Sequence, residues 1–74
     1  MTKPNLYILD DDKQYADLLA EFAIGAGWNA IAENDPVIFI EKDISDVHVL
    51  VLDLVMPKLD GIEVIRAIAE KNAT

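Results

Sequence analysis

The chain has 74 residues, 53% of them hydrophobic, and its 14 acidic and 6 basic residues give a net charge of −8. This composition is typical of one small globular unit, and the negative charge argues against direct binding of nucleic acid or of an anionic membrane by this segment. The absence of cysteine excludes disulfides and thiolate metal sites. The apolar run at residues 6–9 is too short for a signal-peptide core or a membrane span, so we expect a cytoplasmic protein.

Two kinds of segment alternate in the first half of the chain. Residues 6–9 are apolar and predict a strand, whereas residues 12–25 have helical spacing of apolar side chains. The apolar face expected for this helix consists of Tyr15, Leu18, Leu19, Phe22 and Ala26. Asp11 or Asp12 is suited to cap the helix, and the glycines at 25 and 27 are suited to end it.

The second half repeats the alternation. Residues 28–32 predict a strand. Asp35-Pro36 is typical of a helix cap followed by the first helical residue, and we favour a short helix here, although the β-branched residues that follow also permit a strand. Residues 47–52 are apolar apart from His48 and predict a strand buried on both faces. Residues 62–72 predict a third helix, marked by Ile62, Ile65, Ile68 and Ala69.

This β-α-β-α-β-α order indicates parallel strands with right-handed crossovers. In such sheets the ligand site lies at the carboxyl ends of the strands. The first predicted strand runs into Asp10 and Asp11, and the third runs into Asp53. We therefore expect these three carboxylates, which are distant in sequence, at one edge of the sheet.

Carboxylates gathered at one edge need a raised pKa or a bound cation. Oxygen ligands without Cys or a nearby His favour a hard ion such as Mg²⁺, and an aspartate beside that ion can act as a nucleophile towards phosphorus. The alternative is that the aspartate run is a helix cap with solvated acid. Asp35, Asp46 and Asp60-Gly61 are typical of caps and turns, and a lone His48 is more typical of a strand than of a ligand set.

Two stretches, "ILDDD" at residues 8–12 and "VLVLDLVMPKLDG" at residues 49–61, resemble the receiver domain of two-component response regulators. In that family a phosphoacceptor Asp is followed by Met-Pro and then by Asp-Gly. Asp53, Met56-Pro57 and Asp60-Gly61 match this spacing without gaps. The resemblance implies a flavodoxin-like α/β fold with strand order 2-1-3, truncated to three βα units.

The resemblance also implies a signalling module rather than an enzyme, and a role for each matching residue. Asp53 accepts a phosphoryl group from a histidine kinase or phosphotransfer protein and contributes to a Mg²⁺ site. Asp11 binds Mg²⁺ directly, Asp10 acts mainly through metal-bound water, and the backbone carbonyl of Val55 is a further ligand. Asp12 belongs to the start of the helix.

The family's domain has five βα units, with a Ser or Thr at the end of strand four and a Lys at the end of strand five. Neither position is present here, since Lys58 lies in a different loop and Thr74 precedes the place of strand four. We therefore expect residues 1–74 to be the first three units of a longer regulator. The third strand then becomes a sheet edge, which predicts self-association through that strand or by domain swapping.

Two other functions are weighed against this one. The Asp-x-Asp motif of haloacid-dehalogenase-type phosphatases is met by Asp10 and Asp12, but Gln14 stands where that motif has Thr or Val, and Asp53 has no role in it. A degenerate receiver that acts only as an interaction module is the second alternative, and the intact Asp10, Asp11 and Asp53 argue against it.

Overall fold

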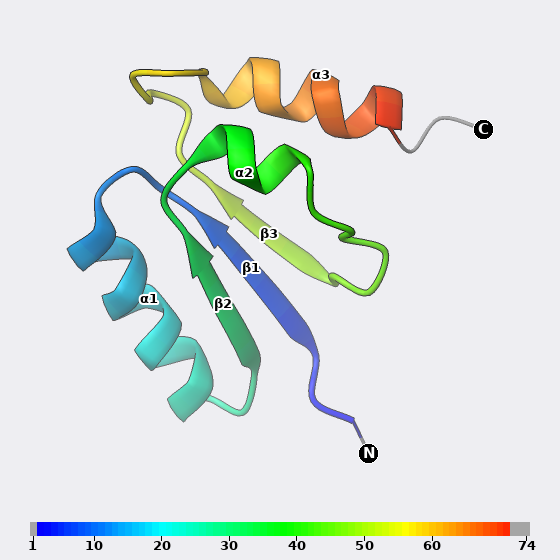
Figure 1. The fold of residues 1–74 in the computed structure, drawn as a ribbon. Helices are drawn as coiled ribbons and strands as arrows, with labels where there is room; N and C mark the ends of the chain where they lie inside the picture. Colours follow the sequence, from blue (N-terminus) through cyan, green and yellow to red (C-terminus); the bar gives the residue numbers. More distant parts are fainter. Residues whose placement is uncertain (1, 72–74) are drawn as a thin grey trace.

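The computed structural model describes residues 2–71, which form a three-stranded parallel sheet with helices on both faces (Figure 1). The elements are β1 (Asn5–Leu9), α1 (Lys13–Gly25), β2 (Asn29–Glu33), α2 (Pro36–Ile40), β3 (Val49–Leu52) and α3 (Gly61–Lys71). The strand order is β2-β1-β3, with β1 parallel to both neighbours. The flavodoxin-like order 2-1-3 and the short helix α2 are confirmed, and the predicted end of α3 at Asn72 lies outside the described residues.

The central strand fixes the position of the acidic residues. Tyr7, Ile8 and Leu9 of β1 are buried because β1 has a strand on each side and helices above and below. The backbone ladder continues beyond the strand, since the Asp10 amide donates to the Glu33 carbonyl at 3.2 Å and the Asp53 amide donates to the Leu9 carbonyl at 2.9 Å. The first bond ties Asp10 to the end of β2, and the second places Asp53 beside the end of β1, next to Asp10.

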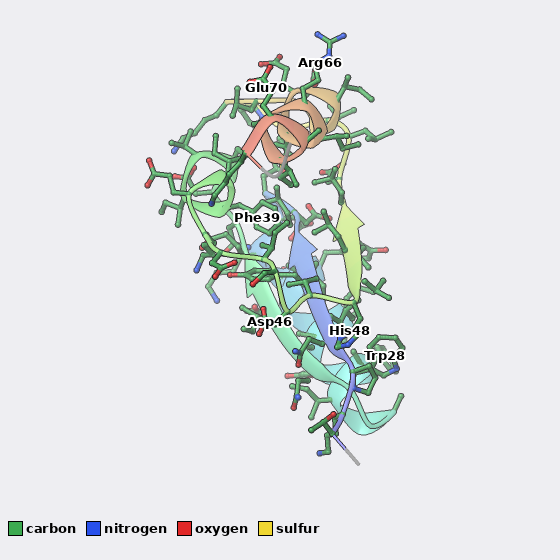
Figure 2. The ribbon with its side chains drawn as sticks, turned by 90° about the vertical axis from the view of Figure 1, so that its right-hand side faces the viewer. Trp28, Phe39, Asp46, His48, Arg66 and Glu70 are labelled. Atoms are coloured by element: carbon green, nitrogen blue, oxygen red, sulfur yellow. The ribbon has the colours of Figure 1, made fainter. Side chains whose placement is uncertain are left out.

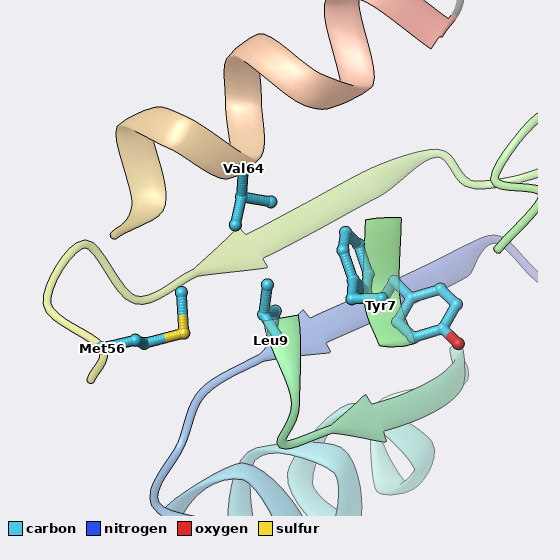
Figure 3. Close-up of a cluster of buried hydrophobic side chains, with 5 residues drawn as sticks. Tyr7, Leu9, Met56 and Val64 are labelled. Atoms are coloured by element: carbon cyan, nitrogen blue, oxygen red, sulfur yellow. The ribbon is translucent and has the colours of Figure 1, made fainter. Parts of the chain in front are cut away.

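The hydrophobic core lies between the sheet and the two helices α2 and α3. Its buried members are Tyr7, Leu9, Phe39, Met56 and Val64 (Figure 3). The rings of Tyr7 and Phe39 meet edge to face, with centroids 5.0 Å apart and an interplanar angle of 86°. Phe39 points from α2 towards the sheet, whereas Arg66 points outward from α3 (Figure 2). Because Met56 belongs to this core, the loop after β3 is held to the body of the protein.

Both predicted helix caps are present. Asp12 caps α1, because its Oδ1 accepts a hydrogen bond from the Tyr15 amide at 3.1 Å. Asp35 caps α2 in the same way, accepting from the Val37 amide at 2.9 Å, with Pro36 as the first helical residue.

The predicted apolar face of α1 is wrong, apart from Leu19. Tyr15, Leu18 and Phe22 are 52%, 49% and 71% exposed, whereas Ala16 is completely buried. The side of α1 that lies on the sheet is made of residues that are buried or half-buried: Ala16, Leu19, Ala20 and Ala23. Small side chains let the helix approach the sheet closely, and a pattern search weighted towards large apolar residues selects the neighbouring stripe.

The prediction of full burial for the third strand is also wrong. β3 is an edge strand, and Val49 and Val51 are 40% and 39% exposed because α1 lies mainly over β2 and β1. In α3, Val64 is buried and Ile68 packs against the core, while Ile62 and Ile65 are about half exposed. The helix therefore lies where the sequence predicts it, but the side that faces the core differs from the predicted apolar face.

No helix within residues 2–71 is long and apolar enough to cross a membrane.

Candidate metal and phosphoacceptor site

Three carboxylates meet at the carboxyl ends of β1 and β3. One oxygen each from Asp10, Asp11 and Asp53 lies within 4.8 Å of the others. Asp10 and Asp53 are half-buried, and Asp11 is exposed. The structure thus brings together the three acidic residues that the strand pattern places at one edge, and we call them the acidic site.

Asp10 is held by the turn that leads into α1. Its Oδ1 accepts a hydrogen bond from the Asp12 amide at 3.0 Å. Burial raises the pKa of the Asp10 carboxyl above its ordinary value, and the nearby charges of Asp53 and Asp11 raise it further, against the Asp12 hydrogen bond, which lowers it. Negative charge in the site is therefore only partly compensated by the protein itself.

Asp53 begins the loop between β3 and α3, residues 53–60, which we call the acceptor loop. Its Oδ1 accepts from the Val55 amide at 3.1 Å, and the Val55 side chain is 82% exposed. The role of the Val55 carbonyl as a ligand stays a prediction. Met56 belongs to the core and therefore holds this loop against the body of the protein.

The Asp-Gly pair at the end of the acceptor loop is explained by close packing. The Gly61 amide donates to the Leu54 carbonyl at 3.0 Å. A Cβ on Gly61 would lie 2.7 Å from the Asp53 carbonyl oxygen and 2.8 Å from the Leu54 Cα. Asp60 accepts from the Glu63 amide at 2.8 Å and caps α3. Glycine is required here because the helix begins against the backbone of Asp53.

Two polar contacts of the segment after β2 could not be found from the sequence pattern. The Asn34 side chain donates to the Asp10 carbonyl at 3.1 Å, and Lys58 forms an ion pair with Asp35 at 2.7 Å. Neither pair is suggested by spacing, because each joins residues from different elements. By contrast, His48 lies at the other end of β3, where its Nδ1 accepts from the Asn5 amide at 2.9 Å (Figure 2).

The donor set fits a hard divalent cation. Three carboxylates supply only oxygen, which is the ligand that Mg²⁺ and Ca²⁺ take, and a site with few protein ligands suits Mg²⁺, which keeps several waters. One oxygen of each carboxylate lies within 4.8 Å of the others, which is compact enough for a shared cation. The acidic site therefore has both the chemistry and the compactness of a magnesium site.

No protein-family model matches the chain. Two curated relatives are similar to it over nearly its whole length. Response regulator RR06 of Streptococcus pneumoniae is 33% identical over 70 residues, which cover 92% of this chain and 32% of the relative. Transcriptional regulatory protein CpxR of Escherichia coli K12 is 29% identical over 69 residues, which cover 93% of this chain and 30% of the relative. The chain thus spans about a third of the length of these relatives.

Solved structures share the fold. Response regulator StyR superposes with a TM-score of 0.83 at 28% identity, covering 95% of this chain and 36% of StyR. The BeF3-activated DrrB receiver domain superposes with a TM-score of 0.76 at 25% identity, covering 96% of this chain and 59% of the DrrB chain. TrrA of Thermotoga maritima, solved in complex with Mg²⁺-BeF, gives 0.81 at 24% identity, covering 93% and 61%, and this last likeness concerns the fold alone.

Fold and site together define an α/β module with parallel strands in the order 2-1-3 and clustered acids at their carboxyl ends. Its sequence and fold are those of a response regulator receiver domain, of which the chain covers a part.

Proposed function

We propose that the chain is the phosphoacceptor part of a receiver domain, in which Asp53 takes a phosphoryl group from a histidine kinase or phosphotransfer protein. The observation that carries this proposal is the acidic site, in which Asp53 shares a cluster with Asp10 and Asp11. The likeness to the DrrB receiver domain, which was solved in a BeF3-activated form, supports the proposal.

In this proposal each residue has a separate task. A carboxylate oxygen of Asp53 attacks the phosphorus, the phosphorus–nitrogen bond of the donor phosphohistidine breaks, and an acyl phosphate forms. Asp10 and Asp11 hold the cation, with the Val55 carbonyl as a further ligand. Bound Mg²⁺ supplies neutralisation of charge on the transferring phosphoryl group. The Val55 amide orients the Asp53 side chain through the hydrogen bond to its Oδ1.

The proposal gives the chain the first three βα units of the domain. The strand-four hydroxyl and the strand-five lysine of the family have no counterpart among the described residues, and Lys58 is paired with Asp35 rather than placed in the acidic site. Acceptance of the phosphoryl group is therefore proposed for this chain, whereas the response to phosphorylation is proposed for residues supplied outside it.

Acetyl phosphate with Mg²⁺ tests the acceptor directly. We expect a phosphoryl adduct on Asp53, seen by mass spectrometry, that is absent in Asp53→Asn. Asp46→Asn is the matched control, because it removes one carboxylate from an exposed turn at the other end of the sheet. An adduct on Asp10 would instead support a phosphatase of the haloacid-dehalogenase type. Complete absence of an adduct would favour a degenerate receiver that acts as an interaction module.

We also propose that the chain associates with itself through β3. Within residues 2–71, β3 is paired on one side only, by β1, and its Val49 and Val51 are exposed. An exposed apolar edge is a template for another strand. Sedimentation velocity at micromolar concentrations tests this, and Val51→Lys, which places a charge on that strand, should shift the chain towards the monomer. A wild-type chain that is folded and monomeric would contradict it.

A further inference from the structure

The segment that ends β2 and leads into α2, residues 33–35, contacts the backbone of Asp10 and, through Lys58, the loop that begins at Asp53. We propose that this linking segment positions the cation site, with Asn34 holding the end of β1 at Asp10 and Asp35 holding the acceptor loop through Lys58. The inference rests on the proposed function, because it concerns how the same site is kept in shape. Asn34 and Lys58 act in it as positioning residues and not as ligands.

The first contact fixes the backbone of Asp10. The Asp10 amide donates to the Glu33 carbonyl at 3.2 Å, and the Asp10 carbonyl accepts from the Asn34 side chain at 3.1 Å in a partly buried bond. Both polar groups of the Asp10 backbone are therefore bound by the linking segment. The two bonds fix the Asp10 backbone, from which the carboxylate reaches its bond with the Asp12 amide.

The second contact fixes the acceptor loop. Asp35 uses one carboxylate oxygen to cap α2 and the other to accept from the Lys58 ammonium at 2.7 Å. The cap holds the Asp35 carboxylate in place, so that only the Lys58 side chain loses freedom when the ion pair forms. Lys58 lies five residues after Asp53 in the exposed part of the acceptor loop, between the buried Met56 and Gly61. The ion pair therefore restrains the part of the loop that packing leaves exposed.

The linking segment is itself ordered by Glu33. One oxygen of the Glu33 carboxylate accepts from the Asn34 amide at 2.9 Å and from the Asp35 amide at 3.0 Å, and the other lies 3.7 Å from the Lys42 ammonium. These bonds hold Asn34 and Asp35 in a single turn. The two contacts are thus made by one preorganised unit, which ties Asp10 and the Lys58 part of the acceptor loop to the same turn.

Two substitutions should change the affinity for Mg²⁺ in one direction if the linking segment positions the site, and in the opposite direction if charge alone matters. Lys58→Met removes a positive charge and Asn34→Asp adds a negative one, so that charge alone would strengthen cation binding in both variants. Loss of positioning weakens it in both, because Met cannot pair with Asp35 and Asp cannot donate to the Asp10 carbonyl. Lys13→Met is a matched control, since it changes the net charge equally and breaks an exposed ion pair with Asp17 on α1.

The test is a Mg²⁺ titration of the whole chain, followed by the amide NMR signals of Asp10, Asp11 and Asp53. We expect Lys58→Met and Asn34→Asp to bind about two- to fivefold more weakly than the wild type, the range that loss of an exposed ion pair or one hydrogen bond implies. Lys58→Arg should restore binding, and Lys13→Met should bind equally or more tightly. Hydrogen exchange at the Val55 amide, measured without metal, should be faster in Lys58→Met only.

The outcomes separate this inference from the function on which it rests. Wild-type binding that is lost in Asp53→Asn but unchanged or tighter in Lys58→Met and Asn34→Asp overturns the positioning role and leaves the proposed function intact. A wild-type chain that binds no Mg²⁺ overturns both. Weaker binding in the two variants, with urea unfolding midpoints close to the wild type and rescue by Lys58→Arg, supports the inference.

Discussion

Substitution of Gly61 by alanine tests whether the start of α3 is packed as tightly against Asp53 as the structure shows. The added Cβ would lie 2.7 Å from the Asp53 carbonyl oxygen and from the Leu54 Cδ2, and 2.8 Å from the Leu54 Cα. The Leu54 side chain is 53% exposed and can rotate away, but the two backbone atoms cannot. The helix start or the acceptor loop must therefore shift.

The expected loss is about 1–2 kcal/mol. Overpacking in a tight site costs about 1–3 kcal/mol, and replacement of glycine by alanine in a helix returns up to about 1 kcal/mol. Small domains have little stability to lose, so this is a large fraction of the total. The measurement is urea unfolding followed by circular dichroism. Because the displaced atom belongs to Asp53, Mg²⁺ affinity should fall as well.

The other glycines supply controls for the same chemical change. Gly25 is the last residue of α1, and a Cβ there meets nothing within 4 Å, so Gly25→Ala should stabilise the chain by about 0.5–1 kcal/mol. Gly27 has φ +96°, so Gly27→Ala should destabilise it by about 1 kcal/mol or more through backbone strain alone. If the Gly61→Ala chain is as stable as the wild type while the two controls behave as stated, the start of α3 is not packed closely against the backbone of Asp53 and Leu54.

Three further substitutions test the core, the exposed helix face and the acidic site. Phe39 is 1% exposed, so Phe39→Ala should cost about 3–5 kcal/mol and abolish the cooperative urea transition, and a retained transition would contradict this. Phe22 is 71% exposed, so Phe22→Ala should change the free energy of unfolding by no more than about 0.5 kcal/mol. The same substitution should lower the fraction of the chain that sediments as an oligomer. The raised pKa of Asp10 gives a stability contribution that is present below the unfolded pKa of about 3.9 and is lost as the pH rises through the folded value. Asp10→Asn keeps the acceptor for the Asp12 amide, so it should be more stable than the wild type at pH 7 and equal to it near pH 3 in urea unfolding.

The elements and the acidic site could be predicted because their signals are local. The caps at Asp12 and Asp35 are set by residues within one turn of helix, and the strand ends are marked by a change from apolar to acidic residues. Once the strands are known to be parallel, the carboxyl ends of β1 and β3 must meet at one edge, which brings Asp53 to Asp10.

The contacts of the linking segment could not be predicted, for a physical reason. The Asn34–Asp10 and Asp35–Lys58 pairs depend on how far β2, β1 and the acceptor loop extend beyond the sheet. The path of the acceptor loop follows from the packing of Met56 and Gly61 and not from any repeat in the sequence. A polar residue in a loop looks the same in the sequence whether it is solvated or paired across the fold.

The errors in the predicted burial of α1 and β3 lie on the same side of the sheet, and this has a consequence for association. The register pairs Leu6 with Val49 and Ile8 with Val51, so these side chains lie on the sheet face opposite the core of Tyr7 and Leu9. That is the face on which α1 packs, and α1 covers Ile8 while leaving Val49 and Val51 exposed.

The exposed stripe of α1, which is formed by Tyr15, Leu18 and Phe22, is part of the same layer of the fold. A strand that paired with β3 by backbone hydrogen bonds alone would leave this apolar surface in water. An incoming unit that adds a strand to β3 and a helix beside α1 would bury both. If the chain associates through both the β3 edge and the exposed stripe of α1, Phe22→Ala and Val51→Lys should each weaken association. If it associates through the β3 edge alone, only Val51→Lys should weaken it.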